Sequence, residues 1–400
     1  MSIAKRNIRA LTWANLLGGV NFLEPVVTLF YLHRGFSQTE IFFVLLSFSV
    51  SMAVFEVPSG AFADRFGAKI SFLAGTFARL LSVICLAVPE PAFVILSQIL
   101  SALSFSFFSG SDEALIYESL KAEGREKEMA GVMGKIQAAS LAPMALAMLV
   151  GAWLAGGLRE EDFLVLIALR TVCVLGQFVF VLRVVEPPHL AAYRDHPWKH
   201  VRRGMREILQ SPGLLLLFAN VTVIFITTYI FTTFEQPWLK NLGVPVSVLG
   251  VIAAAGLLLS AWAARMVDVL LKLRSAKFWL WVTGLGIVCS HLLIVGLAGS
   301  AVAAIAAGFL LRACRAVRNP VSSQMFNEYI SSGSRATALS LLSVADSVFD
   351  LVLVLTLTGI SVWGLPAVFL GCAGLALCGL FLPARSAEEE RASLKLSRDA

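Results

Sequence analysis

Charged residues are scarce in this chain. Asp, Glu, Lys and Arg together make up 14% of its 400 residues, whereas about 25% of the residues of an average soluble domain are charged. Hydrophobic residues make up 58% of the sequence, and the mean hydropathy is +0.81. This composition excludes an ordinary soluble domain and indicates an integral membrane protein.

Sequence signatures of catalysis and metal binding are also missing. The sequence has no glycine-rich phosphate loop and no nucleophile in an elbow motif. Its six cysteines lie in apolar runs without metal-ligand or redox spacing, and its five histidines have no ligand spacing. We therefore expect no enzyme, no metal and no cofactor, and an ion gradient as the energy source.

The net charge of +6 does not indicate a nucleic-acid partner. The basic residues lie in short connections between apolar runs, which is typical of membrane topology and not of a phosphate-binding patch. The basic start of the chain leads into an apolar run without a small-residue cleavage site, so we expect a retained first helix and not a signal peptide.

The apolar runs predict an all-α membrane protein with twelve transmembrane helices, each needing about 20 apolar residues. The predicted spans are 11–32, 39–60, 70–88, 91–115, 130–156, 162–184, 213–237, 246–266, 277–298, 301–320, 336–358 and 362–383. One long polar stretch, 186–211, separates two sets of six spans. The predicted parts are therefore a bundle over 1–185, a central loop over 186–211, a second bundle over 212–384 and a tail over 385–400.

The distribution of Lys and Arg predicts the orientation in the membrane. One set of connections holds only Arg34, Arg159 and Lys240, whereas the alternate set and both ends of the chain hold the remaining loop cations. Loops rich in Lys and Arg remain in the cytoplasm. We expect the central loop and both termini to be cytoplasmic.

A charged turn separates the second and third predicted spans. The stretch EVPSGAFADRFGAK, residues 56–69, resembles the loop between the second and third helices of the major facilitator superfamily. The matching positions are Gly60, Ala63, Asp64, Arg65, Gly67 and Lys69. Ala68 stands where that family has a first basic residue. The alternative interpretation is a plain cytoplasmic turn that keeps its charges in water.

The resemblance implies two pseudo-symmetric six-helix bundles that work by alternating access, with parallel repeats. Residues 109–118 and 335–340 also resemble a bacterial drug-efflux-like branch, of the drug:proton antiporter type. In such proteins the charged turn is part of a cytoplasmic gate. We expect Arg65 to meet Asp112, Glu113 or Glu118, and Asp64 to lie near Arg335 at the start of the eleventh span.

Glu24 is the first candidate for proton coupling. An ionisable group at membrane depth is costly and is a functional hypothesis by default. Pro25 beside it removes a helical hydrogen bond and frees a carbonyl. The alternative for Glu24 is a fixed salt bridge to Arg312 or Arg315.

Asp346 and Asp350 form a second candidate for proton coupling. They are four residues apart, so they share one helix face, and two adjacent carboxylates favour keeping one proton. The alternative is that they pair with Lys135 or Arg170 as part of the packing between helices.

Polar stripes on the first, seventh and tenth predicted helices are candidates for the substrate surface, because the resembled family lines its cavity with the first, fourth, seventh and tenth helices. Besides Glu24, the candidates are Asn21, Thr28, Tyr31, Asn220, Thr228, Thr232, Glu235, Arg312, Arg315 and Asn319. Arg318 is expected at the cytoplasmic surface. The alternative is that these groups form hydrogen bonds between helices.

The sequence thus predicts a major facilitator transporter in a bacterial cytoplasmic membrane, with a small molecule and protons as its partners and a monomer as its default state. Proton-coupled export of a small amphipathic compound, a drug or a secreted metabolite, is the leading function. Transport of an anionic solute, such as a siderophore or an organic acid, is the alternative, and a membrane sensor that transports nothing is a third possibility.

Overall fold

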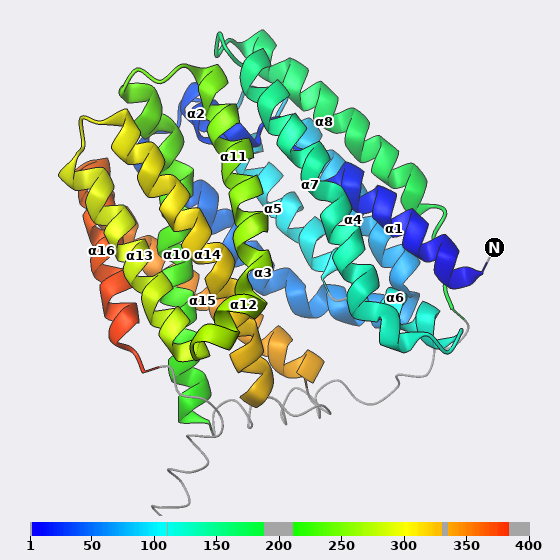
Figure 1. The fold of residues 1–400 in the computed structure, drawn as a ribbon. Coiled ribbons are helices and arrows are strands. Elements are labelled where there is room, and N and C mark those ends of the chain that lie inside the picture. The colour runs from blue at the N-terminus through cyan, green and yellow to red at the C-terminus, as the bar shows by residue number, and fades with distance from the viewer. Residues whose placement is uncertain (1, 110, 188–210, 330–334, 384–400) are drawn as a thin grey trace, which may run out of the picture. The chain divides into compact units, whose positions relative to one another are not determined.

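The computed structural model describes residues 2–109, 111–187, 211–329 and 335–383, and the secondary structure of these residues is helical (Figure 1). The chain divides into two compact units. Unit 1 comprises Met1–Asp195 with Pro245–Ala254, and unit 2 comprises His196–Val244 with Ala255–Ala400. Most of the predicted central loop and the predicted tail lie outside the described residues.

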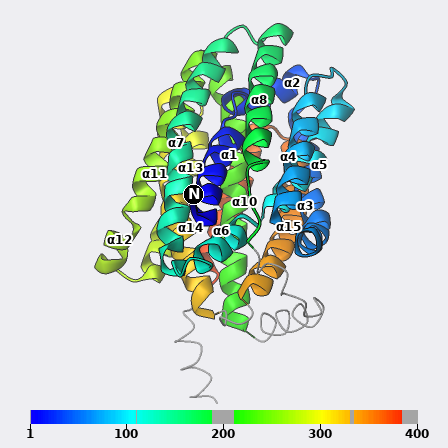
Figure 2. The ribbon, with the colours of Figure 1, turned by 90° about the vertical axis from the view of Figure 1, so that its right-hand side faces the viewer.

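Unit 1 contains the helices from α1 to α8 and the first part of α11. Their bounds are α1 Ile3–Gly19, η1 Glu24–Val26, α2 Val27–His33, α3 Gln38–Phe66, α4 Ala68–Cys85, α5 Pro91–Phe108, α6 Ser111–Lys121, η2 Glu126–Glu128, α7 Met129–Leu154 and α8 Glu160–Val181. Within this unit α1 packs against both α7 and α8, and α4 packs against α5 and α8 (Figure 2).

Unit 2 is built around α10 and α13. The bounds of its helices are α10 Pro212–Asn241, α11 Val246–Arg265, α12 Val267–Leu273, α13 Ala276–Gly296, α14 Ala301–Tyr329, α15 Arg335–Ser361 and α16 Leu365–Phe381. Helix α10 packs against α14, α15 and α16, and α13 packs against α14 and α16.

The fold-class prediction is confirmed. Each of the twelve predicted spans coincides with helix in the described part of the chain. Ten helical segments there are long and apolar enough to cross a membrane, and α16 is a shorter apolar helix. The remaining span, α14, carries Arg312, Arg315 and Arg318, which make it too highly charged to be identified as a span by its apolar character alone.

Local sequence signals account for the helix ends around the charged turn. Ser37 and Glu40 form a capping box at the start of α3, because each side chain bonds the backbone N–H of the other residue. Gly67 joins α3 to α4 with φ of 87° and ψ of 162°, a backbone conformation open almost only to glycine.

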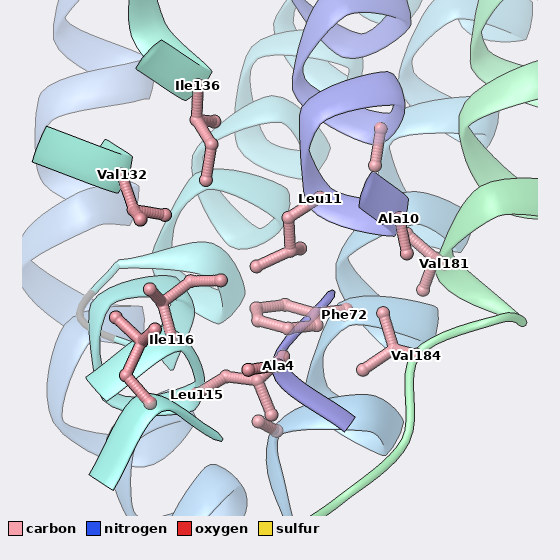
Figure 3. Packing of buried hydrophobic residues seen from close by; sticks show 13 residues of the cluster. Ala4, Ala10, Leu11, Phe72, Leu115, Ile116, Val132, Ile136, Val181 and Val184 are labelled. Carbon is pink, nitrogen blue, oxygen red and sulfur yellow. The ribbon is translucent and has the colours of Figure 1, made fainter. Parts of the chain in front are cut away.

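Unit 1 has an apolar core around Phe72. Figure 3 shows this ring between Leu11 of α1, Ala4 at the start of the same helix, and Ile116 of α6. Packing of this kind stabilises membrane helices chiefly by van der Waals contact, because lipid is as apolar as the core itself.

Many large apolar side chains lie on the outside of the helices. Trp153, Val302 and Phe381, for example, are 71%, 78% and 78% exposed. Such a surface is unfavourable in water and suited to lipid tails. The chain is therefore a multi-pass membrane protein.

Candidate functional site

The first span is broken near its middle. Helix α1 ends at Gly19, and helical structure resumes only at Glu24 as η1, which leads into α2. Adjacent Gly18 and Gly19 weaken the helix, and Pro25 cannot donate a backbone hydrogen bond. The prediction of one continuous polar face along a 11–32 helix is therefore wrong, although Pro25 was correctly identified as weakening the backbone ladder.

Arg170 of α8 caps the end of α1. Its Nη2 donates to the carbonyl oxygen of Gly18 at 2.7 Å, and its Nη1 donates to the carbonyl oxygen of Val20 and lies 3.5 Å from that of Leu17. The last carbonyls of a helix have no partner within the helix, and they favour a positive charge. The Arg170 guanidinium thus donates its hydrogen bonds to backbone carbonyls at the break.

A second arginine reaches the same place from α4. Arg79 Nη1 lies 3.4 Å from the Gly18 carbonyl oxygen and 3.3 Å from Gln177 Oε1, and Arg79 Nε lies 3.2 Å from Ser104 Oγ. Gln177 is 1% exposed. Neither Arg79 nor Gln177 was predicted to belong to a site, because nothing in the sequence places them beside Gly18.

The break forms one wall of a cavity of about 240 Å³. The cavity is lined by Gly19, Asn21, Glu24, Met144, Met148 and Arg170. Asn21 Nδ2 donates to Glu24 Oε2 at 3.0 Å, and the Glu24 side chain is exposed. A carboxylate therefore lines the same cavity as two thioethers, which are polarizable and adapt to irregular apolar ligands.

A glycine on α7 allows the broken segment to pack closely. A Cβ atom at Gly151 would overlap the carbonyl oxygen of Phe22 and lie 2.8 Å from its carbonyl carbon. Backbone atoms cannot move aside as a flexible side chain can. Gly151 thus helps to fix the position of the residues that precede Glu24.

The two other candidates from the first span lie elsewhere. Thr28 is fully buried, and Tyr31 is 6% exposed and accepts a hydrogen bond from Gln98 Nε2 at 2.7 Å. Neither residue lines the cavity beside Glu24. For these two residues the structure favours the alternative interpretation, contacts between packed helices.

In unit 2 an ion pair joins α10 to α14. Arg312 Nη1 donates to Glu235 Oε1 at 3.1 Å, and Arg312 Nη2 donates to Glu235 Oε2 at 2.5 Å. The side chain of Glu235 is 3% exposed and that of Arg312 is 17% exposed. Cβ atoms at Gly256 and Gly308 would lie 2.6 Å from Arg312 Cδ and 2.8 Å from Arg312 Nη1, so both glycines make room for the pair.

Arg318 is not at the surface, contrary to its predicted position. It is 3% exposed, donates to the Leu280 carbonyl oxygen at 2.7 Å and bonds Asn220 Oδ1. Asn220 Nδ2 in turn donates to the carbonyl oxygens of Gly379 and Leu382 at 2.7 and 3.1 Å. Asn220 was a candidate for the substrate surface, but its amide is used to join helices.

The remaining candidates on α10 and α14 are dispersed. The hydroxyls of Thr228 and Thr232 donate to backbone carbonyls of their own helix. The Arg315 guanidinium lies 4.5 Å from the centroid of the Phe225 ring, and Asn319 is exposed. Each of the two threonine hydroxyls is thus satisfied within its own helix, and Arg315 lies against an aromatic ring.

Asp346 and Asp350 share a face of α15, as their spacing predicts. Asp346 Oδ1 accepts a hydrogen bond from Thr222 Oγ1 of α10. Asp350 Oδ1 is buried and has no hydrogen-bond partner among the described residues. A buried carboxylate oxygen without a donor is costly as an anion. The pair remains a candidate for proton coupling.

The charged turn is held by a residue that was not predicted. Glu186, which follows α8, accepts a hydrogen bond from the Lys69 backbone N–H at 3.0 Å, and its carboxylate occupies the space that a Cβ at Gly67 would need. A carboxylate at the start of α4 is favoured by the helix dipole. The turn is thus tied to the beginning of the predicted central loop.

Arg65 and its predicted partners make other contacts. Arg65 extends over the Phe66 ring, Asp112 accepts from the Glu113 backbone N–H, and Glu118 lies 3.8 Å from Lys121 Nζ. Among the described side chains Arg65 has no ion pair, so the predicted contact is absent there. Gly60 lies in the C-terminal part of α3 with open space around it. The side chains of Asp64 and Arg335 lie outside the described part of the structure.

Comparison with known protein sequences places this arrangement in a family. A model described as "Major Facilitator Superfamily" matches residues 14–290. "Uncharacterized MFS-type transporter YxaM" of Bacillus subtilis is 25% identical over 247 residues, which are 59% of this chain and 59% of that protein. "Multidrug resistance protein MdtH" of Salmonella typhimurium is 28% identical over 159 residues, which are 38% of this chain and 35% of that protein. The chain therefore spans less than two thirds of the length of each relative.

Solved structures share the fold over nearly their whole length. A point mutant of the nucleoside transporter NupG has a TM-score of 0.78 at 15% identity, covering 94% of this chain and 98% of that chain. The D-xylose-proton symporter has a TM-score of 0.73 at 15% identity, covering 95% and 97%. At such identities the likeness concerns the fold alone. Because the family model matches well over half of the sequence, this chain belongs to the Major Facilitator Superfamily.

Proposed function

We propose that this protein is a secondary transporter that exports a small amphipathic compound carrying a positive charge, in exchange for protons. Members of its family are membrane transporters and not enzymes, in agreement with the absence of an enzyme signature. The proposed location is a bacterial cytoplasmic membrane with both termini inside. The proposed active form is a monomer that alternates access between two bundles, 1–185 and 212–384.

The observation that supports this proposal is the position of Glu24. Its carboxylate is exposed on the wall of a cavity that also presents Met144 and Met148. A single carboxylate can be neutralised by a proton or by a cationic ligand, and it cannot hold both at once. Competition of this kind couples export of a cation to entry of a proton.

The contacts of the buried arginines do not favour an anionic substrate. Arg170 lines the same cavity, but its guanidinium donates to the carbonyl oxygens of Gly18 and Val20. Arg312 and Arg315 are the cations that would bind an anionic solute in that alternative. Arg312 donates to both oxygens of Glu235, and the Arg315 guanidinium lies over the Phe225 ring. A siderophore or an organic acid would have to compete with these contacts, so we rank that alternative second.

The names of relatives support export. MdtH is a multidrug resistance protein, and the sequence likeness extends that expectation to this chain as a proposal. A membrane sensor that transports nothing is the third hypothesis. Measurable solute flux would exclude it.

Flux in liposomes tests the proposal. The purified protein is reconstituted with a pH-sensitive dye inside, a proton gradient is imposed, and tetraphenylphosphonium, a lipophilic cation, is added. We expect cation-triggered proton movement that is lost in Glu24→Gln and retained in Glu161→Gln, a matched change of an exposed carboxylate at the start of α8.

Two results would count against the proposal. Movement of the cation without protons would show a different coupling. Proton movement triggered by an aromatic carboxylate of similar size, and not by the cation, would favour the anionic alternative.

A further inference from the structure

The end of α1 presents a row of backbone carbonyl oxygens inside the membrane. The carbonyls of Leu17, Gly18 and Val20 all lie within reach of Arg170. Backbone acceptors at membrane depth require a donor or a cation, because no lipid group can satisfy them. Broken membrane helices commonly use such carbonyls to coordinate a free cation.

In this chain the position of such a cation is occupied by side chains. The planar guanidinium of Arg170 offers several donors in one fork, which suits a row of carbonyls better than a single ammonium does. Arg79 adds a second guanidinium at the Gly18 oxygen, and Gln177 Oε1 holds Arg79 in place at 3.3 Å.

The absence of a side chain at Gly18 allows Arg79 and Gln177 to lie close to the backbone of α1. A Cβ at Gly18 would lie 2.6 Å from Gln177 Nε2 and 2.8 Å from Arg79 Nη1. Any other residue at this position would therefore push the two side chains away from the carbonyl oxygen. The break, the glycine and the two arginines form one arrangement.

We propose that the break in the first span is a cation-binding site whose cation is built into the chain as the Arg170 guanidinium. The site therefore does not take an exchangeable metal ion. Arg170 is a positioning residue: it fixes the segment between Val20 and Glu24, and leaves the Glu24 carboxylate to face the cavity. This inference does not depend on the transport proposal, because it concerns how the break itself is held.

Chemical rescue tests this assignment. The Arg170→Ala variant should leave a vacant guanidinium site, so its midpoint of thermal unfolding in detergent should fall. Guanidinium chloride at about 20 mM, far below the molar concentrations that denature proteins, should restore at least half of the lost midpoint temperature. Equal concentrations of sodium chloride and of urea, a neutral molecule of the same shape, should restore none.

Two controls isolate the effect. The parent protein should not respond to guanidinium at this concentration, and neither should Cys173→Ala, which removes a side chain from the same face of α8 one turn away. Because Arg79 also contacts the Gly18 oxygen, Arg79→Ala should show a smaller loss with the same selective recovery.

The proposal is overturned if folded Arg170→Ala is destabilised but guanidinium restores no more than sodium chloride or urea. In that case the arginine contributes packing and not a bound cation. If Arg170→Ala yields no folded protein, the Arg79→Ala titration decides by the same criterion. Stability is the readout, so failure here is distinguishable from failure of the transport proposal.

Discussion

Removing one partner of the Glu235–Arg312 ion pair should destabilise the protein much more than removing both. The two side chains share two hydrogen bonds, and both side chains are largely buried. Breaking a buried pair costs about 3–5 kcal/mol, because one charge is left without a partner, whereas replacing both partners by apolar groups is often neutral.

The structure predicts unequal effects for the two single changes. Glu235 is 3% exposed and Arg312 is 17% exposed. An unpaired carboxylate at Glu235 should therefore cost more free energy than an unpaired guanidinium at Arg312. We expect Arg312→Met to cost about 4–5 kcal/mol and Glu235→Leu about 3 kcal/mol. The double variant should be within about 1 kcal/mol of the parent.

Thermal unfolding of the parent, the two single variants and the double variant, all purified in one detergent, measures these differences. A loss of about 4 kcal/mol corresponds to roughly 10 °C in the midpoint for a unit of this size. Gly308→Ala should reproduce part of the loss, since its Cβ would crowd both side chains, whereas Gly374→Ala, with open space around it, should not. A double variant as unstable as the sum of the singles would refute the reasoning.

Two further predictions concern glycines. Gly151→Ala should lower the midpoint of unfolding markedly, because its Cβ would meet the Phe22 backbone. Gly131 on the same helix has open space, so Gly131→Ala should be neutral or stabilising by up to about 1 kcal/mol. Equal effects of the two changes would contradict the packing described for the break. Gly67→Ala should cost about 1–3 kcal/mol from its backbone conformation alone, and more where Glu186 is intact. Introducing Glu186→Ala first should reduce that cost, and an unchanged cost would show that the carboxylate does not occupy the turn.

The helices were predictable because the membrane requires long apolar runs. Every predicted span coincides with helix, and the ends differ mostly by a few residues. The differences are larger where a helix continues into polar sequence, as α3 does to Phe66 and α14 to Tyr329. Hydropathy detects the apolar part of a helix and gives no signal for its polar extension.

The breaks in the helices were not predictable to the same degree. Gly18, Gly19 and Pro25 signal a weak point in the first span, but helices tolerate such residues when neighbours satisfy the backbone. In the fourth predicted span, α5 ends at Phe108 and α6 begins at Ser111. What holds the first break open is Arg170, which is about 150 positions away in sequence, so local patterns cannot reveal it.

The same limit applies to the candidate site. Glu24 could be singled out because a lone carboxylate in an apolar run is rare. Its neighbours Met144 and Met148 carry no sequence signal, since methionine is common in packed helices. Asn220 and Arg318 looked like cavity and surface residues, but they bond each other across about 100 positions.

Proton release on ligand binding tests the central claim most directly. Tetraphenylphosphonium is added to the detergent-solubilised protein in a weakly buffered solution containing a pH dye, and binding is followed in parallel by calorimetry. If Glu24 is the shared site, the parent should release up to about one proton per cation bound, because ligand and proton compete for one carboxylate. Glu24→Gln should release none and bind more weakly. Undiminished release from Glu24→Gln, or binding to the parent without release at any pH, would contradict the account.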